Sequence, residues 1–347
     1  MNLQHLDVSS FRDIPKREID FDYPITFIVG ENARGKTNIL ESIYFLTMGQ
    51  GFRDSREEEL IQFNENDAYV RGQIEVGAKM QLQIFLKRTS TGVTKTYSVN
   101  KVKKRHDQYL LLSTRSVLFS PDQIFIMIGP PDVRRSYFDR IIFSFDTEYR
   151  KRLTNYENAL RRRNKVLEKY TNIAVLKEEL SFWDVYLTEQ ASYITKARDL
   201  YVDFLNGRNT VEEKVFHIEH IKNEFTLERL EETSEEERRY RKTQIGPQKD
   251  DYIISQIHKG VGKSLHHFGS RSEQRLAVYW LKLCEAHAYE EKLRLKPILL
   301  LDDIFSELDG HNKRLTLKTI HEYQTILTTT EPETVELVKK DKKVILL

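Results

Sequence analysis

The segment from Gly30 to Thr37 constrains this chain more than any other, because it reads Gly-Glu-Asn-Ala-Arg-Gly-Lys-Thr and matches the pattern G-x-x-x-x-G-K-[ST]. An apolar, β-branched run at 25–29 precedes it, and apolar residues at helical spacing follow it over 38–48. Backbone N–H groups of such a loop wrap around phosphates, and the positive end of the following helix points at the anion. The pattern therefore predicts a strand, a phosphate-binding turn and a helix.

The loop carries the residue types that nucleotide phosphates need. Lys36 supplies a mobile positive charge near the β and γ phosphates, and the hydroxyl of Thr37 is a ligand for magnesium. A pattern this short also occurs by chance in loops, but the strand before it and the helix after it are the context that the mechanism requires. We expect ATP to lie against Gly30, Glu31, Asn32, Ala33, Arg34, Gly35, Lys36, Thr37 and Asn38.

A second all-apolar run, at 298–301, ends in Asp302 and Asp303. A hydrophobic strand that ends in carboxylates delivers them beside a phosphate loop at the edge of a parallel sheet. We expect Asp302 to hold magnesium, partly through water, and Asp303 to polarise the attacking water. Two aspartates alone are an ordinary strand end; together with the loop they predict ATP hydrolysis, with Asp303 and Lys36 as catalytic residues.

A polar turn of small residues at 268–275 leads into apolar residues at helical spacing. A helix start of this kind can hold a second anion, although a loop with an N-cap is the plainer interpretation. Further along the chain, Glu307 and Asp309 add carboxylates that could face a neighbouring subunit.

The two core strands lie far apart in the sequence, with helical sequence between them. Alternating polar and apolar residues over 70–99 predict an antiparallel meander, whereas 131–206 has hardly any Gly or Pro and indicates several antiparallel helices. The charged stretch 228–242 indicates an exposed helix or linker. We predict an α/β fold: a head with an antiparallel β subdomain, built from 1–120 and 243–347, and an inserted compact helical lobe with its linker at 121–242.

Composition limits the compartment and the partners. Of 347 residues 39% are hydrophobic, enough for about two compact lobes. The formal net charge is only +2, so a nucleic-acid surface must come from local clustering. The single cysteine, Cys284, excludes an internal disulfide framework and a multi-cysteine zinc site. Because 1–11 holds no apolar signal core and no run is long enough to span a membrane, we expect a cytoplasmic protein without a membrane partner.

A phosphate loop, a small-residue turn before a helix and a strand ending in Asp-Asp follow one another in the order found in ABC-type ATPases. Other segments resemble the RecF family, bacterial DNA gap-repair proteins related to SMC heads, along almost the whole chain. Each segment is a modest match, but their order and spacing together are specific. These segments are Ser10–Ile14, Phe119–Asp122, Gly129–Asp139, Tyr156–Asn164, Trp183–Asp184, Gly246–Asp251 and Leu301–Asp309.

The resemblance implies a composite site. In ABC-type ATPases two heads sandwich two nucleotides, and the signature turn of one head caps the γ-phosphate bound to the other. An ATP-dependent homodimer is therefore implied, and Arg12, in the segment that resembles the family's Phe-Arg-Asn motif, joins the nucleotide-binding residues. The signature residues contributed by the second copy are Ser270, Arg271, Ser272, Glu273 and Gln274.

Three positions bear on how well such a site works. Ser272 stands where the family usually has glycine, which lets backbone amides approach a phosphate closely, so ATP-driven dimerisation could be weakened. Gln248 replaces a histidine of the family's Gly-Pro motif. Asp303 is shorter than the glutamate of many ABC ATPases, a feature shared by RecF-type sequences that fits a slow ATP switch better than a fast motor.

The same resemblance implies the partners. These are duplex DNA near single-strand gaps, single-stranded DNA, the mediator proteins RecR and RecO and, indirectly, the recombinase RecA, in DNA replication, repair and the SOS response. Basic clusters would give sequence-independent, salt-dependent DNA binding, although solvated helix faces are the plainer interpretation. The clusters are Lys101, Lys103, Lys104 and Arg105; Arg134 and Arg135; and Lys151, Arg152, Arg161, Arg162, Arg163 and Lys165.

Three other functions compete with this interpretation. A transport ATPase subunit would need a membrane partner, and the segments of the helical lobe that resemble RecF argue against it. A nuclease-linked ATPase would need an additional metal-carboxylate domain, for which the sequence after the ATPase core leaves no room. A scaffold that ATP locks without hydrolysis stays open because of Ser272 and Asp303.

Overall fold

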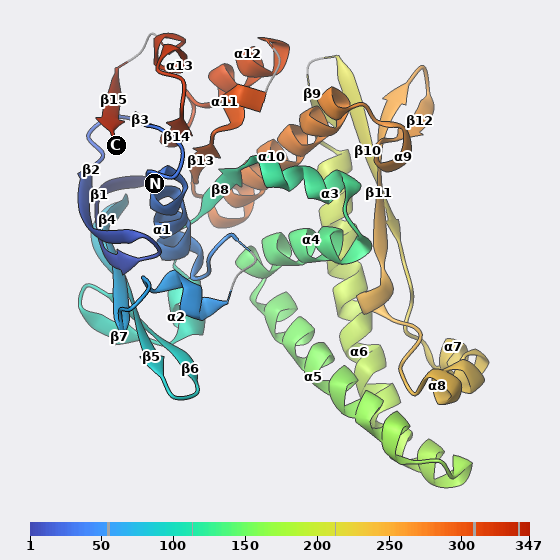
Figure 1. The fold of residues 1–347 in the computed structure, drawn as a ribbon. Coiled ribbons are helices and arrows are strands. Elements are labelled where there is room, and N and C mark those ends of the chain that lie inside the picture. The colour runs from blue at the N-terminus through green and yellow to red at the C-terminus, as the bar shows by residue number, and fades with distance from the viewer. Residues whose placement is uncertain (54–55, 113, 212, 308–309, 339–340) are drawn as a thin grey trace. The chain divides into compact units, whose positions relative to one another are not determined.

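The computed structural model describes residues 1–53, 56–112, 114–211, 213–307, 310–338 and 341–347, and at 306–307, 310–312 and 315 only the course of the backbone (Figure 1). Contacts divide the chain into two compact units. Unit 1 comprises 1–123 and 282–347, and unit 2 comprises 124–281. The chain thus leaves unit 1 after 123 and returns to it within a helix.

The division differs from the predicted boundary, which assigned 243–281 to the head. This segment belongs to unit 2 because β11 (Asp251–His258) pairs in register with β10 (Lys214–Ile221) over its whole length. The inserted lobe therefore contains a β-sheet as well as helices. Unit 1 still consists of a head with two sheets, one of them antiparallel, as the sequence predicts.

A five-stranded parallel sheet forms the centre of unit 1, in the order β15-β3-β14-β13-β8. Almost every residue of β3, β14, β13 and β8 is buried, which explains their continuous apolar runs, since parallel strands are covered on both faces. The strands are β3 (Ile25–Val29), β8 (Ser116–Phe119), β13 (Ile298–Asp302), β14 (Thr325–Thr329) and β15 (Lys342–Leu346).

A six-stranded antiparallel sheet makes up the rest of the unit 1 β-structure, in the order β2-β1-β4-β5-β6-β7. The meander predicted over 70–99 is confirmed as β4, β5 and β6. Alternate residues of this sheet, among them Val8, Val70 and Ile84, are buried in one core with α1. The strands are β1 (Asn2–Phe11), β2 (Ile14–Asp20), β4 (Asp67–Val76), β5 (Ala78–Thr89), β6 (Gly92–Val99) and β7 (Val102–Lys104).

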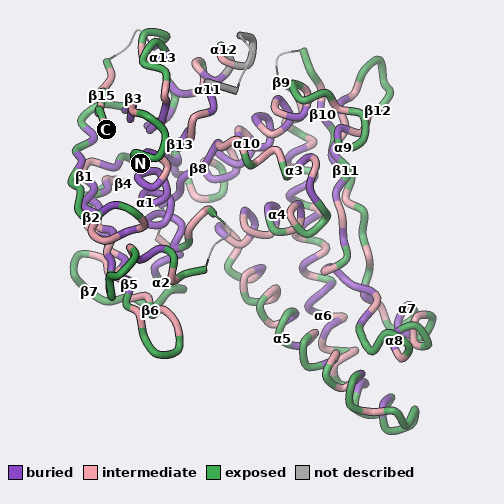
Figure 2. The backbone as a smooth tube through the Cα atoms, viewed as in Figure 1, coloured by how far each residue is buried: buried purple, intermediate pink, exposed green. Residues whose placement is uncertain are grey.

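Helix α1 (Lys36–Met48) starts directly after the phosphate loop and is buried almost all round, as its purple trace in Figure 2 shows. It contacts strands of both sheets, so burial rather than amphipathic surface character holds it in place. Shorter elements complete unit 1: η1 (Glu57–Leu60), α2 (His106–Leu110), η2 (Pro121–Ile124), which ends at the boundary, α11 (Ile304–Glu307), α12 (Gly310–Thr319) and α13 (Glu333–Glu336).

Unit 2 holds the predicted antiparallel helices. Helix α5 (Thr147–Lys169) is capped by Asp146 and lies against α6 (Ile173–Asn206), which is capped by Asn172 (Figure 1). Its four-stranded antiparallel sheet runs β12-β11-β10-β9, with β9 (Thr210–Val211) and β12 (Val261–Ser264). The other elements are α3 (Phe125–Ile128), α4 (Pro131–Phe145), α7 (Leu227–Glu232), α8 (Ser234–Tyr240), η3 (Pro247–Lys249), α9 (Leu265–Phe268) and α10 (Arg271–Leu293), which continues into unit 1.

Candidate nucleotide site

The loop between β3 and α1 has the backbone of a phosphate cradle. Ala33 and Gly35 both have left-handed φ angles, of 63° and 84°, so successive N–H groups turn to one side of the loop. The Lys36 ammonium donates hydrogen bonds to the carbonyls of Gly30 and Glu31, each at 2.8 Å. A buried positive charge is thus held by neutral carbonyls of the loop, where a phosphate would be a stronger partner.

The parallel register brings Asp302 to this loop from a distant part of the sequence. Strand β14 lies between β3 and β13, and Thr328 pairs with Ile28 on one side and Asp302 on the other. The Asp302 carboxylate then accepts hydrogen bonds from the hydroxyls of Thr37 at 2.9 Å and Thr328 at 2.8 Å. Asp302 thus lies beside the phosphate loop, and its predicted role as a magnesium ligand stays a prediction.

Burial raises the pKa of Asp302, and the hydrogen bonds from Thr328 and Thr37 only partly oppose it. A hydroxyl and a buried carboxylate side by side fit Mg²⁺, which takes oxygen ligands and completes its shell with waters and substrate phosphates. Within the described part of the chain, no group of three or more His, Cys, Asp or Glu side chains could hold a metal. Thr37 and Asp302 would thus be the protein's share of a site that the nucleotide completes.

Asp303 follows the strand in a left-handed conformation, with φ 46°, and its N–H donates to the Thr328 hydroxyl at 3.0 Å. One threonine therefore anchors both aspartates, which places Asp303 beside Asp302. Its predicted role with the attacking water stays a prediction. The side chains of Glu307 and Asp309 lie outside the described residues.

Two charged residues beside the loop have no counterpart among the residues predicted from the sequence. Glu41 of α1 is fully buried, and its carboxylate binds the Arg12 guanidinium through two hydrogen bonds of 2.8 and 2.9 Å. Arg53 lies 3.6 Å from the same carboxylate, and its charge partly opposes the rise in the pKa of Asp302 that burial causes. The signal was present: Glu41 interrupts an apolar helix, and a buried charge needs a partner.

Arg12 therefore has a structural partner, and its predicted contact with the nucleotide stays a prediction. Asn38 lies at the start of α1, where its amide donates to Asp13. The exposed loop residues Glu31 and Arg34 form an ion pair of 3.3 Å. Asn32 and Ala33 are exposed at the loop's tip.

The predicted signature turn lies in unit 2, whereas the phosphate loop lies in unit 1. Ser270 and Glu273 cap α10 reciprocally: the Ser270 N–H donates to the Glu273 carboxylate at 2.7 Å, and the Glu273 N–H donates to the Ser270 hydroxyl at 3.3 Å. A hydrogen bond from Lys263 lowers the pKa of Glu273. The Gln274 amide is buried against the Leu265 carbonyl, while Arg271 and Ser272 are exposed at the turn.

Several family-like segments of unit 2 serve its packing. The Arg198 guanidinium is buried between Asp139 and Asp250, at 2.9 and 2.6 Å, and His220 joins Asp250 to Asp199. Gly246, with φ 118°, approaches Tyr156 so closely that any Cβ would collide with the tyrosine hydroxyl. The Gly246–Asp251 segment therefore contributes to the packing of unit 2, through Gly246 and Asp250.

The three basic clusters differ in how many of their charges are exposed. Arg163 is buried between Asp184 and Glu237, and Arg134 is bound bidentately by Asp251. Arg135 donates to the Asp250 carbonyl, and Arg152 pairs with two glutamates. The cluster on the β6–β7 hairpin is different: Lys101, Lys103 and Lys104 are exposed, and within the described part of the chain only Arg105 has an ion pair, with Asp107.

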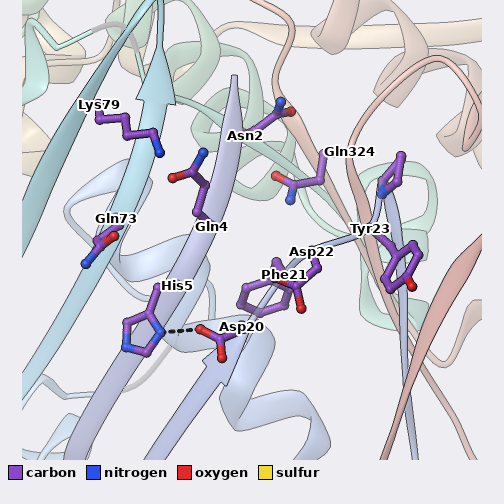
Figure 3. A pocket seen from close by; sticks show the side chains of 11 residues that line it. Asn2, Gln4, His5, Asp20, Phe21, Asp22, Tyr23, Gln73, Lys79 and Gln324 are labelled. Carbon is purple, nitrogen blue, oxygen red and sulfur yellow. Dashed lines mark hydrogen bonds and ion pairs between the residues drawn. The ribbon is translucent and has the colours of Figure 1, made fainter.

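A polar cavity of about 630 Å³ lies in unit 1 at the other end of the parallel strands, beside the start of β3 (Figure 3). Gln4, Gln73 and Lys79 line one side of it, and a hydrogen bond from His5 lowers the pKa of Asp20 on another. No residue predicted for nucleotide binding lines this cavity, and nothing in the sequence pattern points to it.

Among the described residues, no helix is long and apolar enough to cross a membrane.

Comparisons with known proteins agree with this geometry. The family model described as RecF/RecN/SMC N terminal domain matches residues 2–346. The DNA replication and repair protein RecF of Caldanaerobacter subterraneus subsp. tengcongensis is 31% identical over 354 residues, which cover 97% of this chain and 96% of that protein. A solved structure of the recombination mediator protein RecF-ATPrS in the RecFOR pathway matches with a TM-score of 0.86 and 29% identity, covering 99% of this chain and 96% of that one.

A more distant structure shares the fold alone. The Smc head domain from Pyrococcus furiosus, solved with a bound domain of ScpA, matches with a TM-score of 0.52 and 18% identity over 96% of this chain and 91% of that one. Both structural matches place the fold among the ABC-type ATPase heads that the sequence predicts. The chain therefore belongs to the RecF family of DNA replication and repair proteins, within the wider group of RecF, RecN and SMC heads.

Proposed function

We propose that this protein is an ATP- and magnesium-controlled DNA clamp that acts at single-strand gaps. The observation that carries the proposal is the Thr37–Asp302 hydrogen bond, which joins the phosphate loop to the carboxylate strand across 2.9 Å. That pairing supplies the oxygen ligands of a magnesium ion bound to nucleotide phosphates. A solved structure of the recombination mediator protein RecF-ATP in the RecFOR pathway, 29% identical to this chain, supports the choice of nucleotide.

The residues of unit 1 have separate tasks in this proposal. Lys36 exchanges its two loop carbonyls for the β and γ phosphates, and Thr37 and Asp302 hold the magnesium ion, which neutralises phosphate charge. Asp303 orients the attacking water. Because an aspartate reaches less far than a glutamate, hydrolysis is slow, and ATP serves as a switch.

Closure comes from a second copy. The turn formed by Ser270, Arg271 and Ser272 begins a helix of 23 residues, so it offers an anion exposed polar groups and a helix N-terminus together. In the closed dimer this turn caps the γ-phosphate bound to the other copy, and DNA is gripped until hydrolysis. RecR and RecO are the proposed partners in the RecFOR pathway, and the complex helps to load RecA on gapped DNA.

Sizing by light scattering with ATP, with ADP and without nucleotide, each with and without gapped DNA, tests the clamp. A dimer formed only with ATP, and stabilised by gapped DNA, is expected. A monomer under every condition would contradict closure and would point to Ser272 as the disabling residue.

A second candidate is a scaffold that ATP locks without turnover, favoured by the exposed serine at position 272 of the turn. Phosphate release measured with and without gapped DNA separates the two. The clamp requires turnover that DNA stimulates, whereas the scaffold binds ATP and dimerises with none.

A further inference from the structure

A strained turn holds a carboxylate against the phosphate loop. In the β1–β2 turn, Ser10 and Arg12 have left-handed φ angles, of 51° and 56°, which cost non-glycine residues free energy. The turn is held because Arg12 is clamped by the buried Glu41. Asp13, the next residue, is thereby placed in a defined position beside the start of α1.

Asp13 contacts two of the residues assigned to phosphate binding. Its Oδ1 lies 3.4 Å from the position that a Cβ on Gly35 would take, so the carboxylate lies close to the loop. The same oxygen accepts a hydrogen bond from the Asn38 side-chain amide. Asp13 is exposed, and no lysine or arginine of the described chain pairs with it. Its negative charge therefore has no positively charged partner among the described residues, beside the phosphate loop.

Both contacts work against an anionic ligand. A carboxylate within several ångströms of bound phosphates repels them, and partial exposure to solvent weakens that repulsion without removing it. A carboxylate only accepts hydrogen bonds, so it also keeps the donor group of Asn38 turned toward itself. The side-chain oxygen of Asn38, an acceptor, is buried and has no partner among the described residues. An asparagine at position 13 would remove the negative charge, while its amide oxygen can still accept the hydrogen bond from Asn38.

We infer that Asp13 is an affinity-determining residue that holds nucleotide binding below what the loop itself allows. The inference rests on the proposed binding of ATP at the loop. Asp13 favours the nucleotide-free state by its charge and by occupying Asn38, so that the ATP-bound state forms only when nucleotide is plentiful or magnesium neutralises phosphate charge.

Equilibrium binding of a fluorescent ATP analogue tests this, in the full chain with magnesium at low and at 0.5 M salt. We expect Asp13→Asn to bind roughly fivefold more tightly than wild type at low salt, and the gain to shrink at high salt. Asp13→Ala should tighten binding as well, because it removes the charge and releases Asn38. Asp22→Asn is the control: it removes an exposed carboxylate of unit 1, paired with Lys343, before β3, whereas the loop follows β3, whose five residues span about 17 Å.

Several outcomes would overturn the inference. Unchanged or weaker binding by Asp13→Asn would mean that the carboxylate is neutral toward the nucleotide or recruits the cation. Equal tightening by Asp22→Asn would assign the effect to net charge. Failure of the wild type to bind the analogue would instead refute the proposed function, and a far-ultraviolet circular dichroism spectrum of each variant excludes misfolding as the cause.

Discussion

The phosphate loop of unit 1 and the Gly246–Asp251 segment of unit 2 are both rich in charged residues that resemble the family. They differ in the partners that hold those charges. In the loop, Lys36 is held by two carbonyls and Asp302 by two hydroxyls, which are neutral partners. In unit 2, Arg198 pairs with the carboxylates of Asp139 and Asp250. His220 pairs with Asp250 and with Asp199. Charges held by neutral groups are available to a ligand, whereas charges held by opposite charges are already committed.

This difference teaches how to separate binding motifs from structural ones. Removing one member of a committed network leaves a buried charge uncompensated, so the cost appears as lost stability. Removing a charge held by neutral groups leaves no opposite charge buried and unpaired, so it costs the fold less, and the main cost appears when the ligand binds. Three single substitutions test whether the two regions divide in this way, and a double variant extends the test to the β6–β7 hairpin.

The largest effect is expected from Arg198→Met, which keeps the bulk of the side chain and leaves Asp139 and Asp250 without their cation. We expect unit 2 to lose about 3–5 kcal/mol of unfolding free energy. Urea unfolding followed by tryptophan fluorescence measures it, because both tryptophans, Trp183 and Trp280, lie in unit 2. Arg161→Met, at an exposed arginine of α5, is the control and should cost less than about 0.5 kcal/mol. Equal losses of unfolding free energy in the two variants would contradict the proposed difference between the two regions.

Prediction from sequence worked where a pattern is local. The loop at Gly30–Thr37, the strands ending at Val29 and Asp302 and the helices over 131–206 follow from short-range periodicity and turn chemistry. The Thr37–Asp302 contact was also predictable, because carboxyl ends of parallel strands meet at one edge.

Prediction did not reach features that depend on pairing between distant segments. The sheet of unit 2 was missed because β10 and β11 are separated by a charged stretch, and the boundary at 242 was misplaced with it. The pairing of Glu41 with Arg12 needs the first strand to lie on α1, which no local pattern encodes. Nor could spacing reveal that Arg163 is buried while Lys103 is exposed.

The second prediction concerns Lys36→Met. Loss of a charge-assisted contact to phosphate should weaken ATP binding by about 2–3 kcal/mol, roughly 30-fold to 150-fold. The unfolding free energy should change by less than about 0.5 kcal/mol, since only two neutral carbonyls lose a partner. Titration calorimetry and urea unfolding of the same sample measure both. A destabilised variant with normal ATP binding would place Lys36 with the structural charges.

The third prediction uses the raised pKa of Asp302. The pKa of this carboxyl is higher in the folded chain than in the unfolded chain, where it is near 3.8. The carboxyl therefore stabilises the fold fully at pH values below 3.8, and this contribution is lost as the pH rises through the pKa of the folded chain. Without nucleotide, Asp302→Asn should thus be more stable than wild type at pH 7, by about 0.5 kcal/mol, and this advantage should vanish toward pH 4. Hydrogen exchange of β13 and β14 amides across pH measures it.

Asp302→Asn should also lose magnesium-dependent ATP hydrolysis, because an amide is a poorer ligand for the ion. Greater stability with lost turnover would mark Asp302 as a group held ready for a ligand. A less stable variant at pH 7 would show instead that Asp302 is committed to Thr37 and Thr328 as a structural charge.

The smallest effect is expected at the β6–β7 hairpin, where Lys103 and Lys104 are exposed and, like Lys36, have no oppositely charged partner among the described residues. If Lys103 and Lys104 contact DNA phosphates, replacing both with glutamine should reduce the slope of log K against log salt by about 2 and weaken binding several-fold at low salt. Fluorescence anisotropy with gapped duplex at four salt concentrations measures the slope. Lys177→Gln, an exposed lysine of α6, controls for net charge. An unchanged slope would show that an unpartnered charge is not enough to identify a binding surface, and the rule drawn from the loop would then hold only for charges that are buried.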